Sequence, residues 1–386
     1  MNGYRLFVLG AGFSRPAGLP LANELWEEVM SRARQLDWAA DELEYELGEF
    51  ERYRGSRGDD LSVPVDFEDF ISFLDFEHAL GLKGSKSFSG EGNKLQLTLK
   101  WLIAQVIVER TPEPSDLPDC YVQFAEALQP TDYVLTFNYD TVLEDSLDRI
   151  GKPYRLFPDR YEEVNGFYAT TDNSVEEVVV IKLHGSVDWF DKARYDEQVE
   201  SRKASGLDPV ESPPVSIVFN PSSPVSTVPL LEGPQFDDDP LTSAHRVVSG
   251  LEWIYDRQPN LLVSPLMLAP SYAKVLYAAR LKYFFWGLGR TGGYNMGIVV
   301  VGYSLPRHDD YARLILLRMF ANYQQVSWEH EFVGLRKKPV LLIDYRPSSV
   351  SEAYYRLAFS FSESDKTSYF LDGFGEEAVQ AIRELT

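Results

Sequence analysis

Small, polar and titratable residues recur directly after short apolar segments of this chain. Five such groups occur, in the order Gly10-Ala11-Gly12-Phe13-Ser14, Asn138-Tyr139-Asp140, His184-Gly185-Ser186, Gly302-Tyr303-Ser304 and Asp344-Tyr345. Glycines allow a backbone to approach a pyrophosphate closely, and the amides of loops and helix N-termini can converge on a ligand at the ends of parallel strands. One site that gathers all five groups could therefore bind such a ligand.

The glycine-bearing turn is weak evidence when it is taken alone. Gly10 and Gly12 follow an apolar run, as the glycines of a dinucleotide-binding turn do, but Arg15 occupies the place of the third glycine. The sequence also lacks the second strand that would end in an acidic residue about twenty residues later. An ordinary dehydrogenase is therefore disfavoured, and a turn that needs glycine for steric reasons only remains an alternative.

The polar groups have structural alternatives as well. His184 could be a satisfied structural histidine, and Asn138 and Asp140 could cap a helix over residues 141–149. The polar run at 307–310 could enter the site or begin the helix that follows it, and capping is the favoured role there. The joint appearance of these residue types after apolar strands favours the functional interpretation of Asn138, Asp140 and His184.

The elements that must position these residues alternate between strands and helices. The apolar runs cover residues 4–9, 132–137, 178–183, 297–301 and 339–343. They are continuous rather than alternating, which is typical of strands covered on both faces. Between them, one helical face recurs at Leu21, Leu25, Val29, Ala33 and Leu36. The sequence predicts an α/β fold with a doubly wound, parallel, Rossmann-like sheet, whose strand carboxyl ends would form one ligand crevice.

Two long segments interrupt this alternation. Residues 21–128 are predicted to form an inserted helical module. Within this module we expect helices at 67–82, 93–109 and 121–128. The glycine- and serine-rich stretch 81–92 is expected to link the first two of these helices. Residues 190–260 are rich in Pro, Ser and Asp and include the acidic run Asp237-Asp238-Asp239. We interpret this second segment as an irregular, acidic and solvated insertion rather than a binding element.

Composition limits the function classes. The chain of 386 residues carries 37 Lys and Arg against 59 Asp and Glu, and its net charge of −22 disfavours direct binding of nucleic acid. Its single cysteine, Cys120, excludes an internal disulfide and a multi-cysteine zinc site, and no metal is predicted. No apolar run approaches the roughly 18 residues of a membrane span. We expect a soluble protein of the reducing cytoplasm.

Taken in order, the motifs resemble those of the SIR2-like family, distant relatives of the sirtuins that include NADases of prokaryotic antiviral defence. They are Gly10-Ala11-Gly12-Phe13-Ser14 with Ala17-Gly18-Leu19-Pro20, Thr136-Phe137-Asn138-Tyr139-Asp140, Leu183-His184-Gly185-Ser186, and Gly302-Tyr303-Ser304-Leu305. Also similar to that branch is the stretch Ala269-Pro270-Ser271-Tyr272, with Lys274 and Trp286. The resemblance spans residues 10–344 apart from the 190–260 insertion, and implies that 1–386 form one SIR2-like NAD-binding domain.

The resemblance assigns the small residues to the binding of NAD, the expected substrate. Gly302 and Ser304 would meet phosphate or ribose, and Asp344 would accept hydrogen bonds from the adenosine ribose, where sirtuins usually carry asparagine. The residues expected to line the dinucleotide pocket are Gly10, Ala11, Gly12, Phe13 and Ser14.

The resemblance assigns catalysis to three residues. Asn138 would hold the attacking water and the ribose next to nicotinamide, Asp140 would lie near the nicotinamide amide, and His184 would contact the ribose hydroxyls as a base or orienting group. Nicotinamide leaves NAD+ from a pyridinium and departs neutral, so the difficult step is formation of an oxocarbenium-like sugar cation. A dipole, a carboxylate and an imidazole can position the reactants and stabilise that charge.

The chain departs from sirtuin deacylases at two points. Those enzymes carry a four-cysteine zinc module and a glutamine before the catalytic asparagine, whereas this chain has only Cys120 and carries Phe137 before Asn138. The resemblance therefore implies an NAD+ hydrolase that yields nicotinamide and ADP-ribose and serves antiviral defence by NAD depletion. The alternatives are an assembly module that responds to NAD or ADP-ribose without turnover, and a deacylase or ADP-ribosyltransferase.

The resemblance also implies regulation, because unchecked loss of NAD would harm the cell. We expect gating by homo-oligomerisation or by a separately encoded sensor such as a hexameric HerA-like ATPase. Only a terminal helix at 376–385 is expected after the last predicted strand, which favours a sensor on another chain. Contact with DNA would then belong to that partner, and no contact with a membrane is expected.

Overall fold

The computed structural model describes most of the chain. The described residues are 4–82, 92–166, 168–172, 174–207, 217–261, 263–267, 281, 284–285, 295–306, 309–326, 328 and 336–385. Most of the predicted 81–92 link lies outside these residues. So do Ala269, Pro270, Ser271, Tyr272, Lys274, Trp286, Arg307 and His308. Within the described ranges, no helix is long and apolar enough to cross a membrane.

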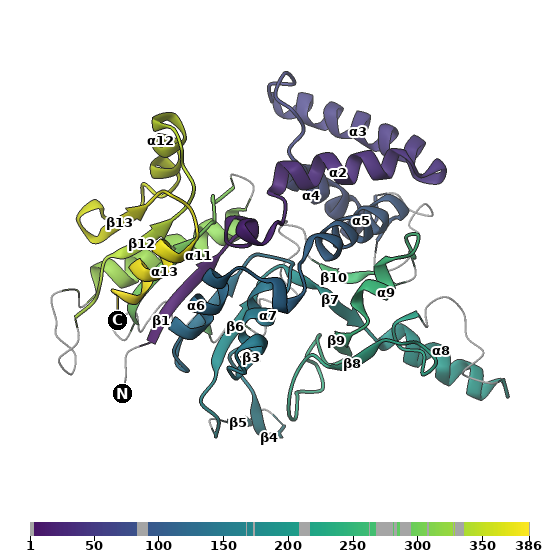
Figure 1. Ribbon diagram of the computed structural model, residues 1–386. Coiled ribbons are helices and arrows are strands. Elements are labelled where there is room, and N and C mark those ends of the chain that lie inside the picture. Colours follow the sequence, from purple (N-terminus) through teal and green to yellow (C-terminus); the bar gives the residue numbers. More distant parts are fainter. Residues whose placement is uncertain are drawn as a thin grey trace.

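A parallel sheet lies at the centre of the molecule (Figure 1). Its strands follow the order β13-β12-β11-β1-β2-β6-β3, and their described pairings are all parallel. In that order they span Thr367–Phe370, Val340–Ile343, Asn295–Val301, Tyr4–Leu9, Tyr133–Thr136, Val178–Lys182 and Tyr154–Leu156. The predicted doubly wound sheet is confirmed, with each of the five predicted strands in it. The outer strands β13 and β3 were not predicted.

The strand register brings the loops that carry the candidate residues to one edge of the sheet. Leu9, the last residue of β1, pairs with Thr136 of β2 and with Val301 of β11. Val301 pairs in turn with Ile343, the last residue of β12, and Thr136 with Lys182, the last residue of β6. The chain order reverses at β1, between β2 and β11, which is where doubly wound sheets form their ligand crevice.

Helices cover both faces of this sheet (Figure 1). Phe7 and Leu9 of β1 face a core that includes α6 (Asp119–Ala127), α7 (Val142–Arg149) and α13 (Glu376–Arg383). Leu6 and Val8 face the opposite core, with α11 (Asp310–Gln325) and α12 (Ser349–Ala358). Burial on both faces explains why the strands are continuously apolar in sequence.

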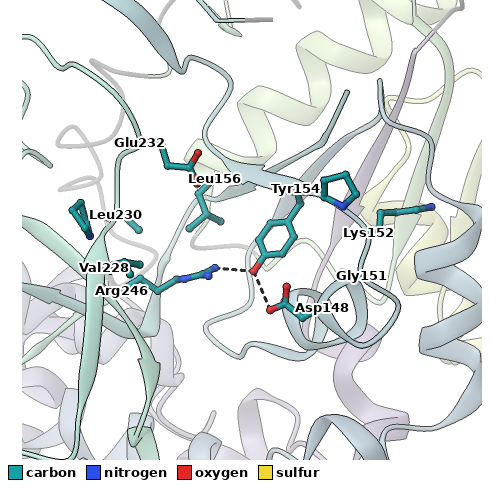
Figure 2. Close-up of a pocket in the computed structure, with 11 residues that line it drawn as sticks. Asp148, Gly151, Lys152, Tyr154, Leu156, Val228, Leu230, Glu232 and Arg246 are labelled. Carbon is teal, nitrogen blue, oxygen red and sulfur yellow. Dashed lines mark hydrogen bonds between the residues drawn. The ribbon is translucent and has the colours of Figure 1, made fainter. Parts of the chain in front are cut away.

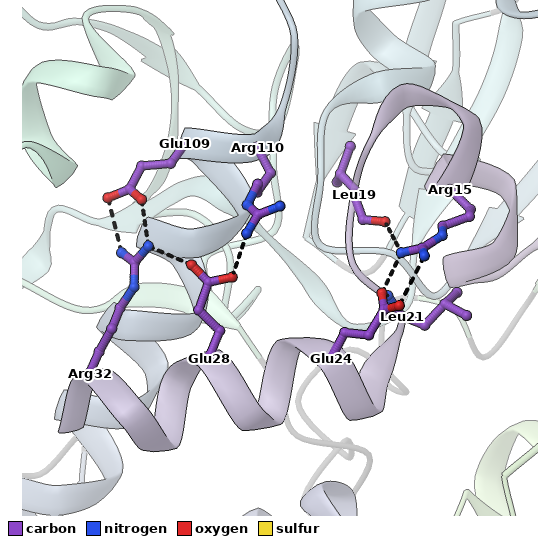
Figure 3. Close-up of polar contacts among 8 residues, drawn as sticks. All are labelled: Arg15, Leu19, Leu21, Glu24, Glu28, Arg32, Glu109 and Arg110. Atoms are coloured by element: carbon purple, nitrogen blue, oxygen red, sulfur yellow. Dashed lines mark hydrogen bonds and ion pairs between the residues drawn. The ribbon is translucent and has the colours of Figure 1, made fainter. Parts of the chain in front are cut away.

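Four longer helices lie within the range of the predicted helical module. They are α2 (Ala22–Arg34), α3 (Asp37–Arg57), α4 (Phe67–Ala79) and α5 (Lys94–Arg110). Leu25, Val29 and Ala33 of α2 are buried, as the helical spacing predicts. Figure 3 shows ion pairs that join α2 to α5 and to the turn after β1, through Arg32–Glu109, Arg110–Glu28 and Arg15–Glu24. These pairs are partly exposed, so each contributes about 1 kcal/mol or less.

The 190–260 segment is more regular than its composition predicts. It contains α8 (Ala193–Ala204), β8 (Ser226–Pro229), β9 (Ala244–Ser249) and α9 (Leu251–Tyr255). With β7 (Gly185–Asp191) and β10 (Pro265–Met267), the two strands form an antiparallel sheet of order β10-β7-β9-β8. A hairpin of β4 (Tyr161–Asn165) and β5 (Tyr168–Thr171) precedes it. Buried Phe190 and Val247 face the same core from this sheet, a local pattern that average composition conceals.

The carboxyl ends of β1 and β11 pack backbone against backbone. Gly10 N donates to Val301 O at 3.0 Å, and Gly12 N donates to Gly302 O at 2.9 Å. A Cβ atom at Gly10 or Gly12 would lie 2.7 Å from backbone atoms of Gly302 or Tyr303. Gly302 itself has a φ of +63°, and a Cβ there would lie 2.2 Å from Phe13 N. No other residue fits these positions without displacing the chain.

We expect Gly302→Ala to lower the free energy of unfolding by roughly 3 kcal/mol, because it adds backbone strain and a steric clash. The matched control is Gly297→Ala in β11, the strand that precedes Gly302, where a Cβ would approach nothing closer than Arg5 Cγ at 3.6 Å. Denaturant unfolding of both variants measures the difference. Equal stability of the two variants would show that the contact between Gly12 and Gly302 is not a constraint.

Candidate functional site

The loop after β1 begins with the short helix α1 (Ala11–Ser14) and faces the site with its backbone. The Phe13 ring is buried in the core, where it contacts Tyr121, and the Tyr121 hydroxyl donates to Phe13 O at 2.7 Å. Ala11 is exposed, whereas Ser14 is buried. The amide of Phe13 donates to Gly10 O, and those of Gly10 and Gly12 bond to β11 and the turn after it. In this structure the glycines therefore provide close packing, and these amides already have acceptors within the chain.

Asn138 follows β2 and reaches back to the loop after β1. Its side-chain nitrogen donates to Gly10 O and to Ser14 Oγ, both at 3.0 Å, and its backbone amide donates to Thr136 Oγ1 at 3.1 Å. Because both donors of the carboxamide are used, its oxygen Oδ1 is the group with which Asn138 could bind a hydroxyl or a water molecule. The structure thus brings together Gly10, Ser14 and Asn138, as predicted for one site.

Asp140 extends the same hydrogen-bond network. Its Oδ1 accepts from Val142 N at 3.1 Å, so it satisfies an amide at the start of α7 as the capping alternative expects. Burial raises the pKa of Asp140, and this rise is opposed by the positive charge of Lys182 and a hydrogen bond from Ser14. Asp140 therefore both caps a helix and shares Ser14 with Asn138.

A cluster of charged groups lies buried beneath Asp140. The Lys182 ammonium donates to the backbone oxygen of Asp140 and lies 2.8 Å from Glu144 Oε1. Asp188 is also buried close by. Burial opposes the charged form of Lys182, but the carboxylates of Glu144, Asp188 and Asp140 raise its pKa overall. Burial likewise raises the pKa of Asp188. Lys182 thus lies among several carboxylates, and the charge of Arg246 also acts on Asp188.

His184 follows β6 and is only 4% exposed. Its Nε2 lies 3.4 Å from Asp309 Oδ2. Its ring also packs edge-on against Phe137, with 5.0 Å between ring centroids, and lies 5.8 Å from the Tyr139 ring. Since Phe137 and Tyr139 flank Asn138 in sequence, the imidazole adjoins the loop that carries the carboxamide. The predicted catalytic residues therefore form two neighbouring groups, which meet at residues 137–139.

The remaining candidates lie farther along the same edge of the sheet. Gly302 is half-buried and Ser304 is exposed. Asp344 follows β12, and its carboxylate accepts from Tyr345 N at 2.8 Å and from the Arg346 guanidinium at 2.6 Å. Burial raises the pKa of Asp344, against the effect of Arg346. No described contact joins Asp344 to Asn138 or His184, so its contact with an adenosine ribose stays a prediction.

Sequence reasoning missed three residues of this site. For Asp309, capping of a helix was favoured over entry into the site, and Tyr303 was considered only as part of a glycine-bearing turn. Lys182 received no role, although a lysine at the end of a continuously apolar strand is itself a signal, because lysine is rarely buried unless it is paired. Lys182 is 1% exposed and Asp309 is also 1% exposed. Among the described residues, no three His, Cys, Asp or Glu side chains could hold a metal ion.

A separate hollow lies beside β3, the outer strand of the sheet (Figure 2). Its volume is about 370 Å³, and it is lined at the start of β3 by Tyr154 and across from it by Arg246 of β9. The Tyr154 hydroxyl accepts from Arg246 at 2.7 Å and donates to Asp148 at 3.4 Å. The acidic side chains of Asp148 and Glu232 line the hollow together with the basic side chain of Arg246. The charge of the hollow therefore selects no single class of ligand.

One family model matches the part of the chain that carries two of the motifs. Residues 132–203, which include Asn138, Asp140 and His184, match a family model described as a SIR2-like domain. A solved structure entitled "Structure of Sir2Tm bound to a propionylated peptide" is 14% identical, with a TM-score of 0.30 over 99% of this chain and 92% of that chain. No curated protein matches the sequence.

We expect Asp145→Asn in α7 to become increasingly stabilising as the pH rises. Burial raises the pKa of Asp145 to about 7, against a hydrogen bond from Thr141 and with support from the charges of Glu144 and Asp188. The folded protein thus holds this proton more tightly than the unfolded chain, so the stability of the wild type falls between about pH 4 and pH 7. The variant cannot lose stability in this way.

Thermal unfolding at pH 5 and pH 8 measures this effect. We expect the stability difference between Asp145→Asn and wild type to grow by roughly 2 kcal/mol over that interval. The control is Asp238→Asn at an exposed position, for which no such growth is expected. A constant difference for Asp145→Asn would show that this carboxyl ionises normally in the folded protein.

Proposed function

We propose that this chain, in which residues 132–203 match a SIR2-like domain, hydrolyses NAD+ to nicotinamide and ADP-ribose. One observation carries the proposal: Asn138, Asp140 and His184 lie buried on adjoining loops at the carboxyl end of a parallel sheet, beside the point where the chain order reverses. Polar groups that are withdrawn from water in this way act more strongly on developing charge than exposed groups do.

The reaction breaks the bond between the pyridinium nitrogen and C1′ of the ribose. The bonding electron pair goes to the nitrogen, so nicotinamide leaves neutral and needs no acid. Water supplies the oxygen that bonds to C1′, and one proton is released. The products are nicotinamide, ADP-ribose and a proton. The main demands on the site are positioning of the ribose and the water, and stabilisation of a sugar cation.

The residues of the site match these demands. Oδ1 of Asn138 would accept a hydrogen bond from the ribose or from the attacking water, because the nitrogen of the same carboxamide is held by Gly10 and Ser14. His184 would take the proton that the water or a ribose hydroxyl loses. Asp140 would lie near the nicotinamide amide, as the resemblance implies.

The buried charges beneath the site support the same reaction. The carboxylates of Glu144, Asp188 and Asp140 surround the Lys182 ammonium, and Arg246 also acts on Asp188. A carboxylate that is held ionised in this cluster would lower the energy of a nearby oxocarbenium-like cation. Its groups are already fixed by the fold, so little reorganisation is needed when the bond breaks.

The biological role that we propose is depletion of NAD in prokaryotic antiviral defence, in the cytoplasm. We further propose that a homo-oligomer or a separately encoded sensor, such as a HerA-like hexameric ATPase, controls the activity. These proposals rest on the family resemblance and on the harm that uncontrolled loss of NAD would cause. The surplus of Asp and Glu over Lys and Arg favours recognition of nucleic acid by the partner rather than by this chain.

Incubation of the purified protein with NAD+ tests the proposal directly. We expect equal amounts of nicotinamide and free ADP-ribose from the wild type, and at least about 100-fold less from Asn138→Ala and His184→Ala, which lose positioning and proton transfer. The matched control is His245→Ala, a half-buried histidine in the separate β7–β9 sheet, whose rate should equal that of the wild type.

The products decide between the proposal and its rivals. O-acyl-ADP-ribose in the presence of an acylated peptide would identify a deacylase, and modified protein would identify a transferase. Binding of NAD+ or ADP-ribose without any release of nicotinamide, in the presence and absence of the partner, would identify a non-hydrolytic assembly module. Any of these results in place of free ADP-ribose would overturn the proposal.

A further inference from the structure

The carboxylate of Asp309 contacts His184, although the two residues follow strands that lie on opposite sides of β1 in the sheet. His184 follows β6, whereas Asp309 precedes α11 and lies in the connection after β11. Asp309 Oδ2 lies 3.4 Å from His184 Nε2 and accepts a hydrogen bond from the Tyr303 hydroxyl at 2.9 Å. The other oxygen, Oδ1, accepts from Ala312 N at 3.2 Å and caps α11.

Aromatic rings enclose this contact. The rings of Phe137 and Tyr303 stack with 4.3 Å between centroids and an angle of 6°, and Phe137 also packs edge-on against His184. Phe137, His184, Tyr303 and Asp309 therefore form a closed ring of contacts, supplied by the loops after β2, β6 and β11. In such an apolar setting a charge-assisted contact is stronger than it would be in water.

Capping alone does not account for Asp309. A cap needs one acceptor atom and is commonly provided by Ser, Thr or Asn at little cost. A carboxylate that is only 1% exposed loses much solvation and needs more than one partner to be stable. Its second oxygen finds these partners in Tyr303 and His184. The contact with the imidazole of His184 therefore explains why an acid occupies this position.

We propose that Asp309 is a positioning residue that fixes the orientation and tautomer of His184. A carboxylate only accepts hydrogen bonds, so it holds the proton of the neutral imidazole on Nε2 and leaves the lone pair on Nδ1. Nδ1 is then the atom that takes up a proton during turnover, and Asp309 stabilises the imidazolium that results. The role of Asp309 in turnover rests on the proposed NAD+ hydrolysis, whereas its effect on the tautomer of His184 does not.

The variant Asp309→Asn separates positioning from capping, because asparagine caps helices as well as aspartate does. We expect its kcat to fall by about 10- to 100-fold, as is usual when the carboxylate partner of a functional histidine is removed. The KM for NAD+ should change by less than about threefold, since Asp309 does not touch the substrate. The control is Asp310→Asn, which removes an exposed acid from the next position of the same helix.

Long-range 1H–15N spectra of the imidazoles provide a readout that does not depend on activity. The chain has five histidines, and the spectrum of His184→Gln assigns the signals of His184 by their loss. We expect the Nε2–H tautomer of His184 in the wild type above neutral pH, and a mixture of tautomers in Asp309→Asn. Asp310→Asn should retain the wild-type spectrum.

The outcomes distinguish this inference from the proposed function. An Nδ1–H tautomer in the wild type would overturn the inference even if Asp309→Asn could not be purified. An unchanged kcat in Asp309→Asn, with nicotinamide release by the wild type, would also overturn it while hydrolysis stands. Absence of release from the wild type, together with the Nε2–H tautomer and its loss in Asp309→Asn, would reject hydrolysis and support the role of Asp309 in orienting His184.

Discussion

The whole site depends on a place where two strand ends touch without side chains between them. Gly12 N bonds to Gly302 O, and a Cβ on either glycine would lie well inside contact distance of the other segment. This contact fixes the turn that carries Ser14 relative to the turn that carries Tyr303 and Asp309. If the two turns moved apart, Asn138 would lose its anchors on the β1 loop, and His184 would lose its carboxylate.

Around this contact, many polar groups are buried away from water, and each of them needs partners within the protein. Asn138 and Asp140 share Ser14 as a partner, and Lys182 lies among the carboxylates beneath them. On the other side of the 137–139 loop, Asp309 satisfies a helix end and a tyrosine as well as the imidazole of His184. A buried network of this kind is rigid when each member is satisfied, and it strengthens electrostatic effects on a bound cation.

The sequence predicts the sheet well because burial on both faces leaves a simple trace, a short continuous apolar run such as 178–183 followed by a polar group. It predicts the groups at the strand ends for the same reason. It does not predict that Asp309 reaches His184, because 125 positions separate them and a cap explains Asp309 locally. It also conceals the β7–β9 sheet, since the composition of residues 190–260, rich in Pro, Ser and Asp, outweighs buried side chains such as Phe190 and Val247 that hold the sheet together. The outer strands β3 and β13 are only partly buried and include polar residues, so neither leaves a continuous apolar run.

The central claim is that the loops after β1, β2, β6 and β11 meet around one dinucleotide. A crystal structure of the wild-type protein with ADP-ribose, the proposed product, tests it most directly. The account predicts that the terminal ribose lies within hydrogen-bond distance of Asn138 Oδ1 and beside His184, with the diphosphate along the turn at 10–14. Binding of ADP-ribose in the hollow between Tyr154 and Arg246, or anywhere that leaves Asn138 and His184 without contact, would contradict it.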